Sequence, residues 1–178
     1  MEQRPGTSEQ DARYSGAARR HALAIERLAG GYEADPELRR DLVQEIHVAL
    51  WRSFSYFEGQ CSERSWVYRV AHNVAVSHLI ARRRLKSGNL VGLEEIADLA
   101  GAADPEAETG ARRLADRLLA TIHRLKPADR QVILLYLEEL TAAEIGEVTG
   151  LSAGAVAVRI HRIKALLCAP FNEGESRT

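Results

Sequence analysis

Hydrophobic residues recur every three or four positions along most of this chain, which is the spacing of an amphipathic α-helix. Such stretches cover residues 18–29, 36–53, 65–84 and 114–125, and further ones follow Pro127, Thr141 and Ser152. The alternation of apolar and polar residues that indicates a β-strand is nowhere long enough to support one. The pattern therefore predicts an all-α protein.

Residues that start and stop helices divide this pattern into elements. Asp35 is a suitable N-cap, Pro36 fits the first helical position, and Glu37 places an acid in the first turn. This order predicts a helix from Pro36 to about Ser53. Gly30-Gly31 is expected to close the helix before it, because glycine weakens a helix and favours its end.

Two short helices around a tight turn are predicted between Thr141 and Leu167. Thr141 and Glu144 have the spacing of a capping box, and Gly150 is expected to end the helix that they start. Ser152 then caps a second helix. This arrangement predicts a helix-turn-helix, whose second helix normally enters the major groove of DNA.

The second of these helices carries basic residues and no acid up to Cys168. Its apolar positions would face the core, and its basic positions would face solvent. The apolar set is Val156, Ile160, Ile163 and Leu167, and the basic set is Arg159, Arg162 and Lys164. Taken alone, the same pattern also fits a solvated basic surface without a ligand.

Charge is distributed unevenly, although the chain as a whole has 24 basic and 25 acidic residues. Residues 39–86 hold nine basic and four acidic residues, a net charge of +5, and residues 111–168 hold nine and six, a net charge of +3. Residues 87–110 hold six acids and no base. Two basic regions separated by an acidic one suggest two contact surfaces for a polyanion.

The acidic segment also contains enough glycine, proline and asparagine to prevent a long helix, although residues 93–99 could form a short turn. We therefore expect two small helical bundles joined by a flexible acidic linker, with the helix-turn-helix in the second bundle. The expected parts are a disordered tail at 1–16, a domain at 17–86, the linker at 87–110, a domain at 111–170 and a tail at 171–178.

Other chemistry finds little support in the sequence. Cys61 and Cys168 have no partners at metal-ligand spacing, so no zinc site or disulfide is predicted, and a redox role for either is left open. The six histidines lack the spacing of a metal site or a catalytic triad, which disfavours an enzyme. No segment reads as a signal peptide or a membrane span. A cytoplasmic protein without a cofactor or metal is expected.

Several motifs together resemble the extracytoplasmic-function (ECF) sigma factors, a compact two-domain class of bacterial transcription initiation factor. The resemblance covers about residues 18–169. The matching pieces, in order, are Asp41-Leu42-Val43-Gln44-Glu45, Leu50-Trp51, Ser65-Trp66-Val67-Tyr68-Arg69-Val70-Ala71-His72-Asn73, the arginines at 82–84, and Arg124-Leu125-Lys126-Pro127 before the helix-turn-helix. The resemblance implies a non-catalytic protein that binds core RNA polymerase through its β′ and β subunits, recognises two promoter elements and promotes promoter melting.

The resemblance gives the helix at 36–53 the task of binding a coiled coil of the polymerase β′ subunit. It implies contacts by Asp41, Gln44, Glu45 and Trp51. The first three lie near one another on the helix surface, away from the apolar stripe, where their carboxylates and amide could pair with basic groups of a partner. For Glu45, an ordinary solvated helix face is the favoured alternative.

The next segment resembles the family's reader of the minus-ten promoter element, where a base of the melted strand enters a pocket. Aromatic rings that stack and donors that bind phosphate suit such a site. The residues implied are Arg64, Trp66, Tyr68, Arg69, Asn73, Ser77, Arg82, Arg83 and Arg84. A core position is favoured for Trp66, which falls on the apolar stripe, whereas Tyr68 and Arg69 are expected to contact DNA.

The helix-turn-helix resembles the family's reader of the minus-thirty-five element. The residues implied are Thr141, Ser152, Ala155, Ala157, Val158, Arg159, His161 and Arg162. Family members often carry a basic residue and a serine where this chain has Ala157 and Val158. We therefore expect fewer polar contacts with bases than in relatives. Recognition would depend instead on phosphate contacts, on apolar contact with thymine methyl groups and on DNA shape. His161 could contact DNA or point to solvent.

The resemblance also implies regulation by an anti-sigma factor and a linker threaded along polymerase, where its carboxylates would mimic phosphates. A DNA-binding regulator of the two-domain response type is the alternative from another class. That alternative requires a ligand or phosphoacceptor domain upstream, and the strand-helix alternation of such a domain is missing from the sequence.

Overall fold

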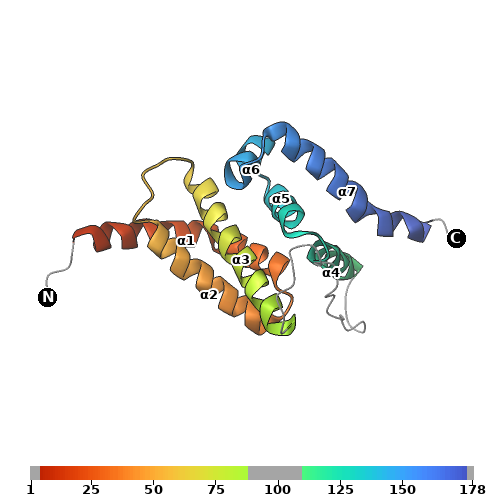
Figure 1. Ribbon diagram of the computed structural model, residues 1–178, viewed down its shortest axis with the longest axis horizontal. Coiled ribbons are helices and arrows are strands. Elements are labelled where there is room, and N and C mark those ends of the chain that lie inside the picture. Colours follow the sequence, from red (N-terminus) through yellow and green to blue (C-terminus); the bar gives the residue numbers. More distant parts are fainter. Residues whose placement is uncertain (1–4, 88–109, 176–178) are drawn as a thin grey trace. The chain divides into compact units, whose positions relative to one another are not determined.

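The computed structural model describes residues 5–87 and 110–175, which form seven α-helices and no strand within those ranges (Figure 1). The chain divides into two compact units, at Met1–Leu90 and Val91–Thr178. The predicted all-α class is therefore confirmed. The acidic linker, except for its end residues, and the turn expected at 93–99 lie outside the described residues.

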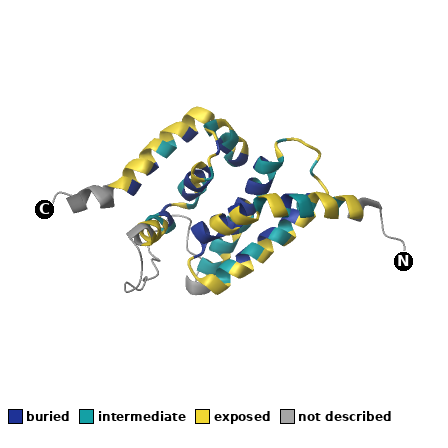
Figure 2. Cartoon of the chain, turned by 180° about the vertical axis from the view of Figure 1, so that it is seen from behind, coloured by how far each residue is buried: buried dark blue, intermediate teal, exposed yellow. Residues whose placement is uncertain are grey.

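The first unit is a bundle of three helices, α1 (Pro5–Tyr32), α2 (Pro36–Ser53) and α3 (Glu63–Ser87). Each contributes an apolar stripe to one core, and Figure 2 shows the buried residues on the facing sides of the helices. At the start of α2, the Asp35 carboxylate accepts hydrogen bonds from the amides of Glu37 and Leu38, at 2.8 and 3.2 Å. The predicted cap is thus confirmed, and it fixes where α2 begins.

The expectation of a disordered tail at 1–16 is wrong for residues 5–16, which form the first turns of α1. Contacts with α2 hold these turns in place. The side chain of Gln10 donates to the Trp51 carbonyl oxygen at 2.6 Å, and Tyr14 Oη lies 3.2 Å from His47 Nδ1. The polar composition of the segment concealed this, because each of these bonds spans more than thirty residues of sequence.

The predicted end of α1 at Gly30-Gly31 is also wrong, because the helix continues to Tyr32. Both glycines are buried, and Tyr32 is 4% exposed with its hydroxyl 2.9 Å from Nδ1 of the buried His72. Packing of this last turn against α3 outweighs the weak helix propensity of glycine.

The second unit contains α4 (Gly110–His123), α5 (Pro127–Leu137), α6 (Ala142–Thr149) and α7 (Ala153–Glu175). Its core gathers apolar residues from all four helices: Ile122, Val132, Ile133, Leu135, Ile145, Val156 and Ile163. The backbone of α7 remains helical through Glu175, so residues 171–175 of the predicted tail continue this helix. Once a helix is anchored by buried residues such as Leu167, each added residue gains a hydrogen bond at little further entropic cost.

Candidate nucleic-acid interface

The turn between α6 and α7 is fixed by local hydrogen bonds. Thr141 and Glu144 form the predicted capping box: the Thr141 amide donates to the Glu144 carboxylate at 2.8 Å, and the Glu144 amide donates to Thr141 Oγ1 at 3.3 Å. Ser152 Oγ accepts from the Ala155 amide at 3.2 Å and so caps α7. The hydroxyls of Thr141 and Ser152, both expected at the DNA, therefore also position the two helices.

Two glycines make the sharp turn possible. Gly150 ends α6 in the left-handed conformation, with φ of 78°, which residues with a β-carbon rarely adopt. Gly146 lies on the inner side of α6, where a β-carbon would come within 2.6 Å of the Leu151 carbonyl oxygen. The chain can thus pass closely over α6 before it enters α7.

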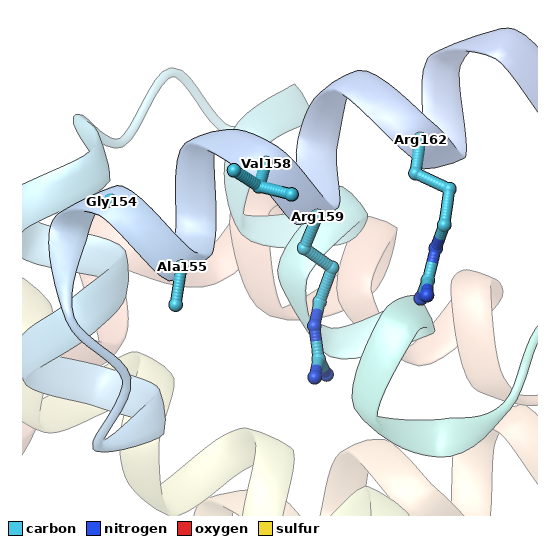
Figure 3. A pocket seen from close by; sticks show the side chains of 5 residues that line it. All are labelled: Gly154, Ala155, Val158, Arg159 and Arg162. Carbon is cyan, nitrogen blue, oxygen red and sulfur yellow. The ribbon is translucent and has the colours of Figure 1, made fainter.

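The outer face of α7 is apolar over its first two turns and basic after them. Ala155, Ala157 and Val158 are exposed, and Val158 is 72% exposed. Gly154, Ala155, Val158, Arg159 and Arg162 line an open hollow of about 340 Å³, and in Figure 3 Ala155, Arg159 and Arg162 project from the same side of the helix. This face can offer methyl groups and guanidinium groups to the same ligand. His161 is exposed as well.

Both arginines of this face contact one carboxylate that the sequence analysis did not single out. Arg162 Nη2 donates to both oxygens of Asp129 at 3.0 Å, and Arg159 Nη1 lies 3.5 Å from Asp129 Oδ1. Asp129 belongs to the first turn of α5, thirty-three residues before Arg162. No spacing rule in the sequence links the two helices, so only the fold reveals the pair.

In the first unit, α2 presents the polar face predicted for polymerase. Asp41, Gln44 and Glu45 are all exposed. Glu45 Oε2 lies 3.3 Å from Nδ1 of His78 on α3, so its carboxylate has a defined neighbour rather than only solvent. Trp51, 38% exposed, donates from its indole nitrogen to Asp11 at 2.7 Å. Residues of α1 therefore complete this face, which the sequence analysis missed.

Two aromatic residues predicted at the DNA, Trp66 and Tyr68, lie in the first turns of α3, after the loop that follows α2. Trp66 is half-buried, donates to Ser53 Oγ at 3.0 Å, and its ring centroid lies 5.2 Å from that of Phe57. Tyr68 is 3% exposed, so the expectation that its ring contacts DNA directly is corrected. Its ring packs inside the bundle, where the Arg64 guanidinium lies 5.9 Å from its centroid.

Tyr56 is the exposed aromatic residue of this loop, with 74% of its surface accessible. Beside it in sequence, an open hollow of about 310 Å³ is lined by Arg13, Phe54, Phe57, Glu58, Gly59 and Glu63. Hydrogen bonds from Arg20, at 2.7 and 3.0 Å, hold the pKa of Glu63 below its ordinary value. Two phenylalanines and three charged residues thus line the hollow, a combination that suits a planar polar ring.

The remaining polar residues predicted along α3 differ in exposure. Asn73 and Ser77 are exposed one turn apart, with Ser77 Oγ donating to the Asn73 carbonyl oxygen at 2.9 Å, whereas Arg69 is half-buried. Arg82 forms an ion pair with the buried Glu33, which makes it part of the bundle.

Two further arginines follow Arg82. Partial burial lowers the pKa of Arg83, and Arg84 is exposed. Of the three-arginine run, Arg84 therefore presents its charge most openly to a phosphate.

Neither a metal site nor a membrane span is found in the described parts of the chain. No group of three histidine, cysteine or acidic residues there could hold a metal ion. Within the same ranges, no helix combines the length and the apolar character that crossing a bilayer requires. Cys61 and Cys168 are free thiols.

The first bundle has a polar helix beside an aromatic loop, and the second bundle has a helix-turn-helix with a basic outer face. Together they define a two-module protein suited to nucleic acid and a protein partner. Comparison with known families agrees. Residues 17–85 match the family described as Sigma-70 region 2, and residues 115–167 match Sigma-70, region 4. The chain belongs to the ECF class of sigma-70 family factors.

Individual relatives are similar over most of the chain. RNA polymerase sigma factor CnrH of Cupriavidus metallidurans is 31% identical over 158 residues, covering 84% of this chain and 82% of that protein. ECF RNA polymerase sigma factor SigG of Mycobacterium tuberculosis is 31% identical over 150 residues, which is 71% of this chain but 40% of SigG. A structure of CnrH in complex with the cytosolic domain of CnrY has the same fold, with a TM-score of 0.67, 24% identity and coverage of 94% and 93% of the two chains.

Proposed function

We propose that this chain is a transcription initiation factor that binds core RNA polymerase, recognises minus-ten and minus-thirty-five promoter elements, and helps to melt the start-site region without catalysing a reaction. The single observation that carries the proposal is the pairing of a capped helix-turn-helix with a separate bundle that matches the polymerase-binding region of sigma factors. Such a factor would act in the cytoplasm, where polymerase and promoter DNA are found.

Core polymerase would bind the exposed face of α2. Asp41, Gln44 and Glu45 offer acceptors to basic groups of the β′ subunit, and Trp51 adds an amphipathic ring of the kind enriched at protein interfaces. The indole of Trp51 is oriented by its hydrogen bond to Asp11. A ring held in one position loses less entropy when a partner docks.

The loop between α2 and α3 would capture an unpaired base of the minus-ten element. The hollow beside Gly59 would receive the base, and Tyr56 would stack on a neighbouring one. Arg64, Asn73 and Ser77 would supply polar contacts, and Arg84 would follow the phosphate backbone. Arg69, Arg82 and Arg83 are less exposed. They would attract DNA without direct contact, by making the electrostatic potential around α3 more positive.

The outer face of α7 would enter the major groove at the minus-thirty-five element. Arg159 and Arg162 would contact phosphates, and Ala155, Ala157 and Val158 would lie against thymine methyl groups. At the start of α7, the Ser152 hydroxyl, which accepts from the Ala155 amide, would donate to a DNA phosphate. Thr141, whose hydroxyl donates to Glu144 at 2.8 Å, would act by fixing the start of α6. The result is a reader with few polar contacts to bases.

Control by an anti-sigma factor is part of the proposal. The solved CnrH structure contains the cytosolic domain of CnrY, and this chain has the same fold. A partner of that kind would cover the α2 face or the α7 face and so block polymerase or promoter.

Reconstituted transcription tests the proposal directly. Purified core polymerase with this chain should initiate at discrete sites on genomic DNA fragments, and core polymerase alone should not. If the chain bound a specific operator without polymerase and had no effect on initiation, a two-domain regulator would be the correct interpretation. Failure of the chain to bind core polymerase in a pull-down would contradict the proposal.

A further inference from the structure

The basic residues of α7 are held by side chains of α5. Asp129 accepts from Arg162 through both carboxylate oxygens at 3.0 Å and lies 3.5 Å from Arg159. Two residues after Arg162, Lys164 Nζ donates to Tyr136 Oη at 2.9 Å. Three basic residues of α7 thus contact α5, and two of them, Arg159 and Arg162, belong to the set predicted to contact DNA.

Asp129 is well placed to hold its two partners. Its side chain is only 14% exposed, whereas that of Arg162 is 62% exposed, so the carboxylate is fixed at the base of the face while the guanidinium reaches the surface. Its position in the first turn of α5, after Pro127, places it at the positive end of the helix, which favours a negative charge. The nearby Lys126 is exposed and faces solvent.

The carboxylate affects DNA binding in two opposite ways. It orients two long side chains, so less conformational entropy is lost when these side chains bind DNA. It also neutralises one of the two positive charges and competes with any phosphate for the same donors. The first effect helps only a duplex whose phosphates meet the oriented guanidinium groups, whereas the second effect weakens binding to every duplex.

We propose that Asp129 is a specificity-determining residue of the helix-turn-helix: it holds Arg159 and Arg162 in one geometry and suppresses their binding to DNA of arbitrary sequence. This inference rests on the proposed function, because it assumes that α7 enters the major groove. Asp129 itself does not read a base. It limits the sequence-independent electrostatic contribution to the free energy of DNA binding.

Asp129→Asn tests this in the full chain bound to core polymerase. Two probes are needed: a duplex that carries a minus-thirty-five element found by start-site mapping, and a duplex of scrambled sequence. For the scrambled duplex, Asp129→Asn should bind about threefold to tenfold more tightly at ~50 mM salt, with a salt dependence steeper by up to about one unit. The ratio of promoter to scrambled affinity should fall.

Asp116→Asn is the matched control, because it removes one negative charge from an exposed position on α4 in the same unit. Asp129→Glu, which keeps the charge, should restore the wild-type salt dependence. A double-mutant cycle adds a second measurement: Arg162→Gln should cost more affinity for the scrambled duplex in the Asp129→Asn background than in the wild type, because Asp129 no longer holds the arginine.

Equal affinity and equal salt dependence of Asp129→Asn and Asp116→Asn would overturn the inference, as would a zero coupling between positions 129 and 162. The scrambled duplex keeps this outcome separate from the proposed function. If the wild-type complex did not prefer the promoter duplex, the proposed function would fail, while the effect of Asp129 on binding to arbitrary DNA would still be measured.

Discussion

Individual side chains set the conditions under which the first bundle is stable. His72 is fully enclosed, and burial lowers its pKa from 6.5 to about 3. It therefore remains neutral in the folded state at pH values at which the unfolded chain binds a proton. Since the unfolded state binds more protons between these two pKa values, folding stability falls as the pH falls through that interval.

The pH dependence of unfolding checks this role of His72. From pH 6.5 to about 5, the free energy of unfolding of the first bundle should decrease by up to about 1.4 kcal/mol per pH unit. In His72→Gln, the free energy of unfolding should change clearly less with pH. Some dependence should remain, because burial also lowers the pKa of His21. At lower pH, Asp35 and Glu63 also begin to bind protons and to change the stability, because their pKa values are below the ordinary ones. The measurement is therefore confined to pH values above about 5. Parallel slopes for the variant and the wild type would contradict the assignment.

Val158, which is 72% exposed on α7, is the residue through which we test the proposed apolar contact with bases. Replacing the thymines of the minus-thirty-five element by uracil removes only their methyl groups. The wild type should lose about 0.8 kcal/mol, roughly fourfold in affinity, for each methyl group buried against Val158. Val158→Ala should bind more weakly but should lose less on the same replacement. A gel-shift titration with both duplexes measures this, and equal losses for the two proteins would argue against the contact.

At the scale of elements, capping motifs in the sequence predicted where helices start, whereas the full length of α1 was not predicted. The caps at Asp35 and Thr141 depend on residues two or three positions away, and the structure confirms both. The two ends of α1 depend on α2 and α3, more than thirty residues distant, so local propensity could not place them. Helix boundaries are decided by packing wherever packing is strong.

The same distinction applies to the candidate site. Exposure of Asp41, Gln44 and Glu45 followed from helical periodicity, and the structure places all three at the surface. Burial of Tyr68, by contrast, depends on where α3 lies against its neighbours. Residues such as Asp11 and Asp129 act across elements, and a linear pattern does not contain that information.

The α6–α7 turn allows a paired test with two glycines. Gly146→Ala would bring a β-carbon within 2.6 Å of the Leu151 carbonyl oxygen, so the backbone would have to shift. We expect a loss of about 1–3 kcal/mol in the stability of the second bundle. Gly154→Ala, where nothing lies within 4 Å, should be neutral or stabilising by up to about 1 kcal/mol. Chemical denaturation followed by circular dichroism compares the two, and a destabilised Gly154→Ala beside an unaffected Gly146→Ala would contradict the geometry.

At the scale of the whole molecule, two separate units imply separable tasks. Combined Asp41→Asn and Glu45→Gln should weaken binding to core polymerase by about tenfold, because two exposed negative charges are removed. The same variant should bind duplex DNA through α7 as the wild type does. Arg162→Ala should show the reverse, with weaker promoter binding at moderate salt and unchanged affinity for core polymerase. Pull-down and gel-shift measurements on both variants decide this, and a variant that loses both activities would show that the tasks are coupled.

The tryptophans offer a way to observe one unit at a time in the intact chain. The chain has two, Trp51 and Trp66, and both lie in the first unit. Tryptophan fluorescence therefore reports unfolding of that unit, because the unit with the helix-turn-helix contains no tryptophan. Because Trp51 donates to Asp11, its emission also senses whether the first turns of α1 remain docked, which makes it a built-in gauge of the face proposed for polymerase.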